Sequence, residues 1–235
     1  MIFREAPLFS AHDDIESWRT AAVSEITAAL QHDLDRNKLA RLLVSGGTTP
    51  APVYRVLAKV PLDWSRVTIA LVDERWLPVD HADSNAYLIQ ETLLTDHAAK
   101  ANFERMLVPG RSLQDSVLEA NRLFAPASVA VLGMGPDGHT ASLFPRMKNL
   151  HDALTTTEDY VYVDAEGCPG AGPWHQRISL TPHGMTKIAQ RILLIRGEEK
   201  RKVLGRALDG TDYDELPIRI ALSQSDPPLR IHWCP

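Results

Sequence analysis

The feature that most constrains the fold is a repeated short run of apolar residues, each separated from the next by a segment with helical periodicity. Runs this apolar, rather than alternating with polar residues, are typical of strands covered on both faces, and such strands form mostly parallel sheets. The predicted strands cover residues 39–44, 67–72, 129–132, 160–163 and 191–195, and the predicted helices cover 13–30, 51–58, 85–94, 112–124 and 198–208. This alternation predicts an α/β fold with an open, mostly parallel, doubly wound sheet and helices on both faces.

Smaller features complete the predicted organisation. Ser10 is expected to cap the first helix, and the loosest stretch, 167–173, is expected to be a loop. We see no internal repeat and no Gly/Ser-rich linker, so residues 1–235 are expected to form a single domain. With 44% hydrophobic and 23% charged residues, the chain can bury a sizeable core.

Composition also limits the partners and the compartment. Twenty-five basic against 30 acidic residues give a net charge of -5, which argues against a nucleic-acid partner. The longest stretch without a charged residue, 123–136, contains Pro126 and is shorter than the roughly 20 residues of a membrane span, so no membrane association is expected. Cys168 and Cys234 form no disulfide framework, which favours the cytoplasm.

Three segments that follow apolar runs carry the polar chemistry, and ligands of open parallel sheets gather at the carboxyl ends of the strands. The first segment is Ser45-Gly46-Gly47-Thr48, followed by Thr49 and Pro50. Glycines let the backbone approach a ligand, and exposed N–H groups at a helix start suit a phosphate. A plain Gly-Gly turn with a threonine cap is an equally good interpretation, and no Walker lysine follows.

The second segment begins Asp73-Glu74-Arg75-Trp76. Asp73 could act as acid, base or orienting group, and Arg75 could hold an anion or a developing oxyanion. A surface salt-bridge cluster explains the same residues. The following stretch at 83–85 has the pattern of a helix cap.

The third segment runs from Gly133 to Pro145 and contains GxGxxG. Asp137 inside the loop, the early Pro145 and the late acidic residue Asp164 all disfavour a dinucleotide site. His139 is the more informative residue, because a histidine at a predicted helix start would stay neutral and available as a base. A histidine that merely caps a turn is the alternative. The other histidines lack metal-ligand spacing, so no metal site is expected, and no GxSxG is present for a serine nucleophile.

Three motifs, one from each segment, carry a resemblance: Ser-Gly-Gly-Thr-Thr-Pro, Asp-Glu-Arg-Trp with its following Pro and Asp-Ser-Asn, and Gly-Met-Gly-Pro-Asp-Gly-His-Thr-Ala-Ser-Leu-Phe-Pro. Taken together, they resemble the glucosamine-6-phosphate isomerase/6-phosphogluconolactonase family, and within it the lactonases. The resemblance runs from about residue 20 to 225. It implies the Rossmann-like fold shared with glucosamine-6-phosphate deaminase. It also implies hydrolysis of 6-phosphoglucono-δ-lactone to 6-phosphogluconate, the second step of the oxidative pentose phosphate pathway, without a cofactor.

The resemblance also implies roles for single residues. His139 looks like the family's catalytic base, Asp73 and Arg75 look like its cleft pair, and the 45–48 loop (Ser45, Gly46, Gly47 and Thr48) looks like its phosphate loop. Arg177 and Lys200 match basic positions that contact phosphate in the related deaminases. One departure concerns Arg177, which follows Gly-Pro-Trp-His-Gln here rather than the Lys/Pro-rich run common in the family.

These assignments lead to a mechanistic expectation. His139 takes a proton from water that attacks the lactone carbonyl, while Arg75 or backbone N–H groups near Gly138 stabilise the oxyanion. Arg177, Lys200 and the 45–48 loop hold the phosphate. The expected partner is thus a small sugar-phosphate lactone, and a monomer is favoured. Two alternatives are a glucosamine-6-phosphate deaminase or isomerase, whose motifs usually read Asp-Glu-Tyr and Gly-His-Ile-Ala-Phe-Asn-Glu-Pro, and a non-catalytic sugar-phosphate sensor, for which no DNA-binding segment is visible.

Overall fold

A parallel sheet forms the centre of the molecule. The structure, a computed structural model, describes residues 6–36, 38–78, 80–107, 109–224 and 227–235. Its seven-stranded sheet has the order β1-β10-β9-β6-β2-β3-β5, with every neighbouring pair parallel. The strands are β1 (Leu8–Ala11), β2 (Ala40–Val44), β3 (Val67–Leu71), β5 (Asn102–Glu104), β6 (Val129–Leu132), β9 (Arg191–Arg196) and β10 (Arg230–Cys234).

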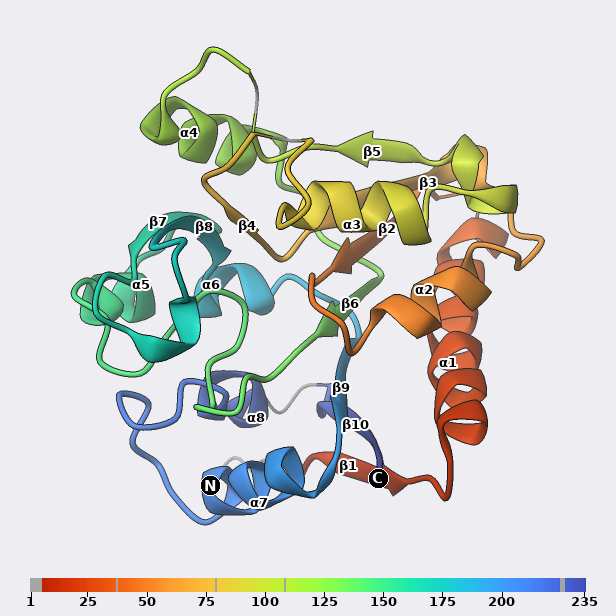
Figure 1. The fold of residues 1–235 in the computed structure, drawn as a ribbon. Helices are drawn as coiled ribbons and strands as arrows, with labels where there is room; N and C mark the ends of the chain where they lie inside the picture. The colour runs from red at the N-terminus through yellow and green to blue at the C-terminus, as the bar shows by residue number, and fades with distance from the viewer. Residues whose placement is uncertain (1–5, 37, 79, 108, 225–226) are drawn as a thin grey trace.

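Helices cover both faces of this sheet, as the alternating sequence pattern predicts. Figure 1 shows α1 and α2 on one side of the strands, and α7 and α8 on the other. The helices are α1 (Ile15–Asp35), α2 (Ala51–Leu57), α3 (Asn85–Thr92), α4 (Leu113–Leu123), α5 (Leu150–Thr155), α6 (Pro182–Met185), α7 (Glu198–Leu208) and α8 (Arg219–Ser223), with short 3-10 turns at η1 (Trp64–Arg66), η2 (Asp96–Lys100) and η3 (Pro169–Ala171). The predicted open, doubly wound α/β class is confirmed.

One predicted strand lies in a different sheet. The run 160–163 does form a strand, β7 (Tyr160–Asp164), but it pairs antiparallel with β8 (Gln176–Leu180), which in turn pairs antiparallel with β4 (Asp73–Arg75). The expectation that all five apolar runs share one parallel sheet is therefore wrong for 160–163. Only Tyr160 and Val163 of β7 are buried, and the other three residues are half-buried, as is typical of a strand in a sheet with one covered face.

The first helix also begins differently from the prediction. Asp14 is the N-cap of α1 and its Oδ1 accepts the N–H of Ser17 at 2.8 Å, whereas Ser10 lies in β1 and caps nothing. The predicted cap at 83–85 is confirmed, because the Ser84 side chain accepts the N–H of Tyr87. The predicted loop at 167–173 contains η3 and otherwise lacks regular structure.

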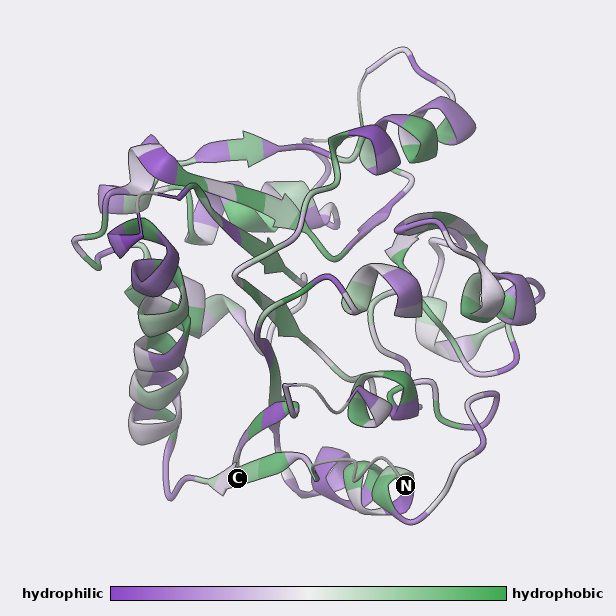
Figure 2. Ribbon diagram, turned by 180° about the vertical axis from the view of Figure 1, so that it is seen from behind, coloured by the Kyte–Doolittle hydropathy of each residue, from purple (hydrophilic) through white to green (hydrophobic). Residues whose placement is uncertain are grey.

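A single hydrophobic cluster connects the two sheets with the helices. It includes Leu43 and Val131 of the parallel sheet, Val163 and Ile178 of the small sheet, and Trp18 of α1. Figure 2 shows this separation of polarity, with hydrophobic residues along the central strands and most hydrophilic residues in the helices and loops around them. Burial of these strands from both sides explains why their sequences are largely apolar, with buried Arg41 in β2 and buried Arg191 in β9 as exceptions.

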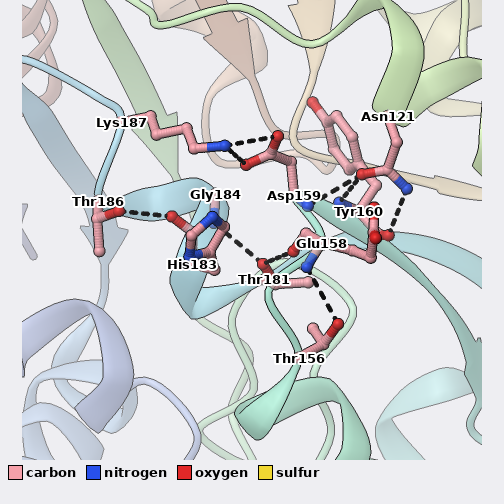
Figure 3. Close-up of polar contacts among 10 residues, drawn as sticks. All are labelled: Asn121, Thr156, Glu158, Asp159, Tyr160, Thr181, His183, Gly184, Thr186 and Lys187. Carbon is pink, nitrogen blue, oxygen red and sulfur yellow. Dashed lines mark hydrogen bonds and ion pairs between the residues drawn. The ribbon is translucent and has the colours of Figure 1, made fainter.

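A network of polar contacts fastens the small sheet to α4 and α6, as Figure 3 shows. Asn121 of α4 accepts the N–H groups of Asp159 and Tyr160 and donates to the carbonyl of Tyr160. The Asp159 carboxylate pairs with Lys187 at 2.7 Å. The side chain of Thr181 donates to the carbonyl of Glu158 at 2.6 Å and accepts the N–H of Gly184 at the start of α6. These contacts fix the entry into β7, and β7 in turn supports β8.

Asn121 pairs with three backbone groups at the start of β7. We therefore expect Asn121→Ala to lower the free energy of unfolding by about 2–4 kcal/mol, the cost of leaving such groups unpaired. Urea denaturation measures this loss. Thr186→Ala is the matched control, since its exposed hydroxyl bonds only the carbonyl of His183, and it should change stability by less than about 0.5 kcal/mol. Equal effects of both substitutions would show that the Asn121 contacts do not hold β7.

Candidate active site

The site lies at the point of the parallel sheet where the strand order reverses. From β2 the chain continues to β3 and β5 on one side of the sheet, and it returns to place β6 and β9 on the other side. Ser45, directly after β2, donates its N–H to the carbonyl of Val131 in β6 at 3.1 Å. The segments that leave these two strands, which begin at Ser45 and Gly133, therefore flank one crevice at the carboxyl edge of the sheet, the place where open α/β sheets bind ligands.

A pocket of about 240 Å³ occupies this crevice. It brings together residues from all three polar segments of the sequence and from two later elements. The lining residues are Ser45, Gly46, Gly47, Thr48, Thr49, Asp73, Arg75, Asn85, Gly133, Met134, Gly135, Pro136, His139, Ala141, Arg177 and Lys200. Of the predicted site residues, Gly138 alone is not part of the lining; its positive φ of +83° and its contact with Leu216 explain why glycine is needed there.

The 45–48 loop offers hydrogen-bond donors to the pocket. Gly46 packs so closely on Asn85 that an added Cβ would lie 1.8 Å from Asn85 Oδ1, and Gly47 has a φ of +95°. Among the residues that the structure describes, none accepts a hydrogen bond from the backbone N–H groups of Gly46, Gly47 and Thr48. Ser45 Oγ is buried and likewise without a hydrogen-bond partner there. Such a set of unpaired donors can bind an anion.

His139 is held by a carboxylate. Its Nδ1 lies 2.6 Å from Asp137 Oδ1, which also accepts the backbone N–H of His139 at 3.2 Å. Burial opposes ionisation of Asp137, but the hydrogen bond and charge of His139 outweigh it, so the pKa of Asp137 lies below its ordinary value. An ionised Asp137 that accepts Nδ1–H leaves Nε2 as the nitrogen that can take a proton.

The predicted electrostatic setting of His139 is wrong in one respect. No helix begins at this residue: residues 140–149 form turns and an isolated bridge, and α5 starts only at Leu150. The control over the imidazole therefore comes from the Asp137 carboxylate rather than from a helix dipole. The same finding weakens the dinucleotide alternative, which needs a helix start next to the glycines.

The small antiparallel sheet supplies the opposite wall. Arg75 of β4 and Arg177 of β8 are register partners, so both side chains leave the same face of the small sheet, and both line the pocket. Buried Asp73 accepts the hydroxyl of Ser142 through Oδ2 at 2.6 Å. Burial lowers the pKa of Arg177; the charge of Asp73 opposes this effect and that of Arg75 adds to it. Two adjacent cations beside one carboxylate form a strongly polar wall that is suited to an anionic or oxyanionic group.

Lys200 approaches the 45–48 loop from α7. Its Nζ lies 3.5 Å from Thr49 Oγ1. Burial lowers the pKa of Lys200 below its ordinary value, and the negative charge of Asp137 opposes that shift. The structure thus places one cation next to the unpaired N–H groups of the loop and two on the facing wall, as Arg75 and Arg177.

Several residues of the site are not identified by the sequence reasoning. From the sequence, Asp137 is interpreted only as a charge that would repel a pyrophosphate. Its position two residues before His139 is the signal that could reveal the pair. Asn85, predicted as part of a cap, also donates to the carbonyl of Asp73 at 2.8 Å. Glu74 lies behind this wall: it is buried and accepts from Arg75 N, Asn85 N, Ala86 N and Ser84 Oγ, so it joins β4 to α3.

Two other features are missing from the described part of the chain. No group of three or more His, Cys, Asp or Glu side chains is arranged to hold a metal ion there. No helix in the same residues is long and apolar enough to cross a membrane.

Comparison with known proteins decides the family. Residues 13–233 match the model of the family described as glucosamine-6-phosphate isomerases/6-phosphogluconolactonase. The chain belongs to this family. A 6-phosphogluconolactonase of Xylella fastidiosa is 47% identical over 226 residues, which cover 95% of this chain and 94% of that protein. A 6-phosphogluconolactonase of Pseudomonas putida is 40% identical, with coverage of 92% and 91%.

Solved structures agree with this assignment. A crystal structure of a 6-phosphogluconolactonase from Shewanella baltica superimposes with a TM-score of 0.89 at 33% identity and covers all of both chains. A monomeric glucosamine-6-phosphate deaminase superimposes with a TM-score of 0.77 at 15% identity, a likeness that shows the shared fold alone. The family thus includes two activities, and the relatives from Xylella fastidiosa, Pseudomonas putida and Shewanella baltica carry the lactonase name.

Proposed function

We propose that this member of the family hydrolyses 6-phosphoglucono-δ-lactone to 6-phosphogluconate, the second step of the oxidative pentose phosphate pathway. The observation that carries the proposal is the pairing of His139 with Asp137 in a pocket that also contains the 45–48 loop, Lys200 and two arginines. A δ-lactone is an activated ester, so one oriented water and one base are sufficient. The pocket supplies a base at one place and anion-binding groups around it.

The reaction begins at His139 Nε2. This atom accepts a proton from water as the water oxygen forms a bond to the lactone carbonyl carbon, and the carbonyl π electrons move to its oxygen. Asp137 stabilises the imidazolium that results, because its carboxylate accepts Nδ1–H at 2.6 Å. The tetrahedral intermediate then reforms the carbonyl, the bond to the ring oxygen breaks, and His139 returns its proton to that oxygen. The product is the open-chain acid.

Charge stabilisation comes from the walls of the pocket. Arg75 reaches the pocket from β4, and we assign it to the oxyanion, a contribution typically worth about 3 kcal/mol. Gly138 lies outside the lining, so its N–H is the weaker candidate for that role. The 45–48 loop, Lys200 and Arg177 are assigned to the phosphate. Fixing the phosphate orients the carbonyl relative to His139 and lowers the entropic cost of the reaction. Asp73 orients the wall through Ser142.

The proposal is tested by following freshly prepared 6-phosphogluconolactone by NMR with and without the protein, since the ester also opens unaided. We expect the δ-lactone signals to disappear faster than the background, in proportion to protein concentration. Glucosamine 6-phosphate is the parallel substrate. Ammonia release from it, or tight binding of the sugar phosphates without turnover of either, would contradict the lactonase assignment.

Lys200 gives a pH-dependent prediction. Its protonated amine binds phosphate, and burial lowers its pKa, so affinity is present at neutral pH and lost as pH rises through that lowered pKa, earlier than an ordinary lysine would lose it. Calorimetric titration with 6-phosphogluconate between about pH 7 and about pH 10 should show this weakening. Lys200→Arg should retain affinity across that range, because a guanidinium keeps its charge. Identical pH profiles for the two proteins would remove Lys200 from the phosphate site.

We further propose that the chain acts as a single-domain monomer in the cytoplasm. One hydrophobic cluster includes both sheets, as expected of a single domain. Cys168 and Cys234 are both free thiols, as is usual in a reducing compartment. Light scattering coupled to gel filtration should give a mass near 26.1 kDa; a mass of twice that value would contradict the monomer.

A further inference from the structure

The 165–175 loop between β7 and β8 contacts the pocket wall from outside. Arg177 donates from Nη2 to the carbonyl of Ala171 at 2.7 Å and from Nε to the carbonyl of Trp174 at 2.9 Å. In the same loop, Gly170 packs against Asp137, and a Cβ added there would lie 2.1 Å from Asp137 Oδ2. The position of Arg177 therefore depends on the position of the loop backbone.

A second loop, residues 80–84, supports the other arginine. Arg75 donates from Nη1 to the carbonyl of Asp83 at 2.6 Å. The side chain of Asp83 contacts the first loop, because its Oδ2 accepts the indole N–H of Trp174 at 2.9 Å. The ring of His81 contacts the Trp174 ring edge-on with centroids 5.1 Å apart. One hydrogen bond thus joins the two loops that hold the two arginines.

We propose that this Asp83–Trp174 hydrogen bond, which we name the clasp, positions Arg75 and Arg177 for the reaction. The inference rests on the proposed function of the two arginines. Neither clasp side chain lines the pocket, so Asp83 and Trp174 are positioning residues rather than catalytic ones. The guanidinium groups are long and flexible, and an active site gains rate when its charged groups are held in place before the substrate arrives.

Trp174 lies in the Gly-Pro-Trp-His-Gln run that precedes Arg177. It is an aromatic residue with a single side-chain donor, the indole N–H. That donor faces the carboxylate of Asp83, and a hydrogen bond to a carboxylate is stronger than one between neutral groups.

Trp174→Phe keeps a ring against His81 and removes the donor, and Asp83→Ala removes the acceptor. We expect each to lower kcat/KM for 6-phosphogluconolactone by roughly five- to tenfold, the value of one partly exposed charge-assisted hydrogen bond. The double variant should lose no more than either single one, because both remove the same contact. Asp83→Asn retains an acceptor and should restore most of the activity. Trp76→Phe, directly after β4 but outside the pocket lining, should behave like the unmodified protein.

Two readouts separate positioning from simple destabilisation. The unfolding midpoint should stay within about 2 °C in all variants, since the clasp is at the surface. In an Arg75→Ala background, the effect of Asp83→Ala should shrink, because one of the two arginines that it positions is gone. Full additivity of Asp83→Ala with Arg75→Ala, or unchanged kinetics in Trp174→Phe, would overturn the proposal.

The clasp is also visible without activity. The indole N–H resonance of Trp174, identified by its loss in Trp174→Phe, should move upfield in Asp83→Ala and stay in place in Asp83→Asn. An unmoved resonance in Asp83→Ala would overturn the clasp even if the enzyme is a lactonase. If instead the unmodified protein opens no lactone while the resonance shifts as expected, the proposed function fails and the contact between the loops stands.

Discussion

His139→Ala is expected to lower kcat for 6-phosphogluconolactone by roughly two to four orders of magnitude, the contribution typical of a positioned general base. The reason is that, among the described histidines, His139 alone lines the pocket, and its Nδ1 is already bonded to Asp137. KM should change little, because the phosphate contacts come from other residues. Stopped NMR or pH-indicator assays, corrected for spontaneous opening, measure both constants.

The matched control for this variant is His151→Ala, because His151 is exposed on α5 and lies outside the pocket lining. It should retain the activity of the unmodified protein. Asp137→Asn should fall between the two, since an amide can keep the ring in place but carries no charge for the imidazolium. Near-normal turnover in His139→Ala would mean that the base is another group of the pocket.

Gly135→Ala is expected to cause the second-largest loss, about 10- to 100-fold in kcat, by displacing the base rather than removing it. A Cβ at residue 135 would lie 2.2 Å from His139 Cε1 and Nδ1 and 2.6 Å from Asp137 Oδ1. Such overlap forces the imidazole or the carboxylate to move, and overpacking of this kind costs typically about 1–3 kcal/mol. Misplacement of a reacting group by about 1 Å can cost roughly a hundredfold in rate.

The position of the ring in Gly135→Ala can be followed by the NMR signals of His139. They should shift relative to those of the unmodified protein, together with the loss of kcat. Gly133→Ala is the control for ring position, because a Cβ there meets only Ser45 Oγ, at 3.7 Å, an ordinary contact. Unshifted His139 signals and full activity in Gly135→Ala would contradict the close packing of this turn.

The parallel sheet is predictable because burial on both faces leaves a direct trace in the sequence. β2, β3, β6 and β9 are runs of apolar residues, and the predicted bounds of all four agree with the structure within one residue at each end. β8 and β10 are not predicted, because polar residues make up a larger share of these strands: Gln176, Arg177 and Ser179 in β8, and Arg230 and His232 in β10. The edge strand β1 is exposed along its whole length and carries no core pattern at all.

The site is predictable as residue types but not as contacts. Glycines and hydroxyls after β2, and charges after β3, mark strand ends where ligands bind, and the structure places them around one pocket. The antiparallel pairing that brings Arg177 beside Arg75 joins β8 to β4, a strand far away in the sequence. The Asp137–His139 pair depends on a tight turn rather than on the predicted helix. Such geometry follows from tertiary packing, which periodicity does not record.

The most direct test of the central claim compares two lactones that differ only in the phosphate. If the anion-binding groups orient the ring for His139, kcat/KM should be high for 6-phosphogluconolactone and lower by at least about a hundredfold for unphosphorylated gluconolactone. His139→Ala should remove the part of this difference that lies in kcat and leave the part that lies in KM, because other residues hold the phosphate. Equal rates on both lactones, or a phosphate preference that persists undiminished without His139, would contradict the claim that the phosphate site serves this base.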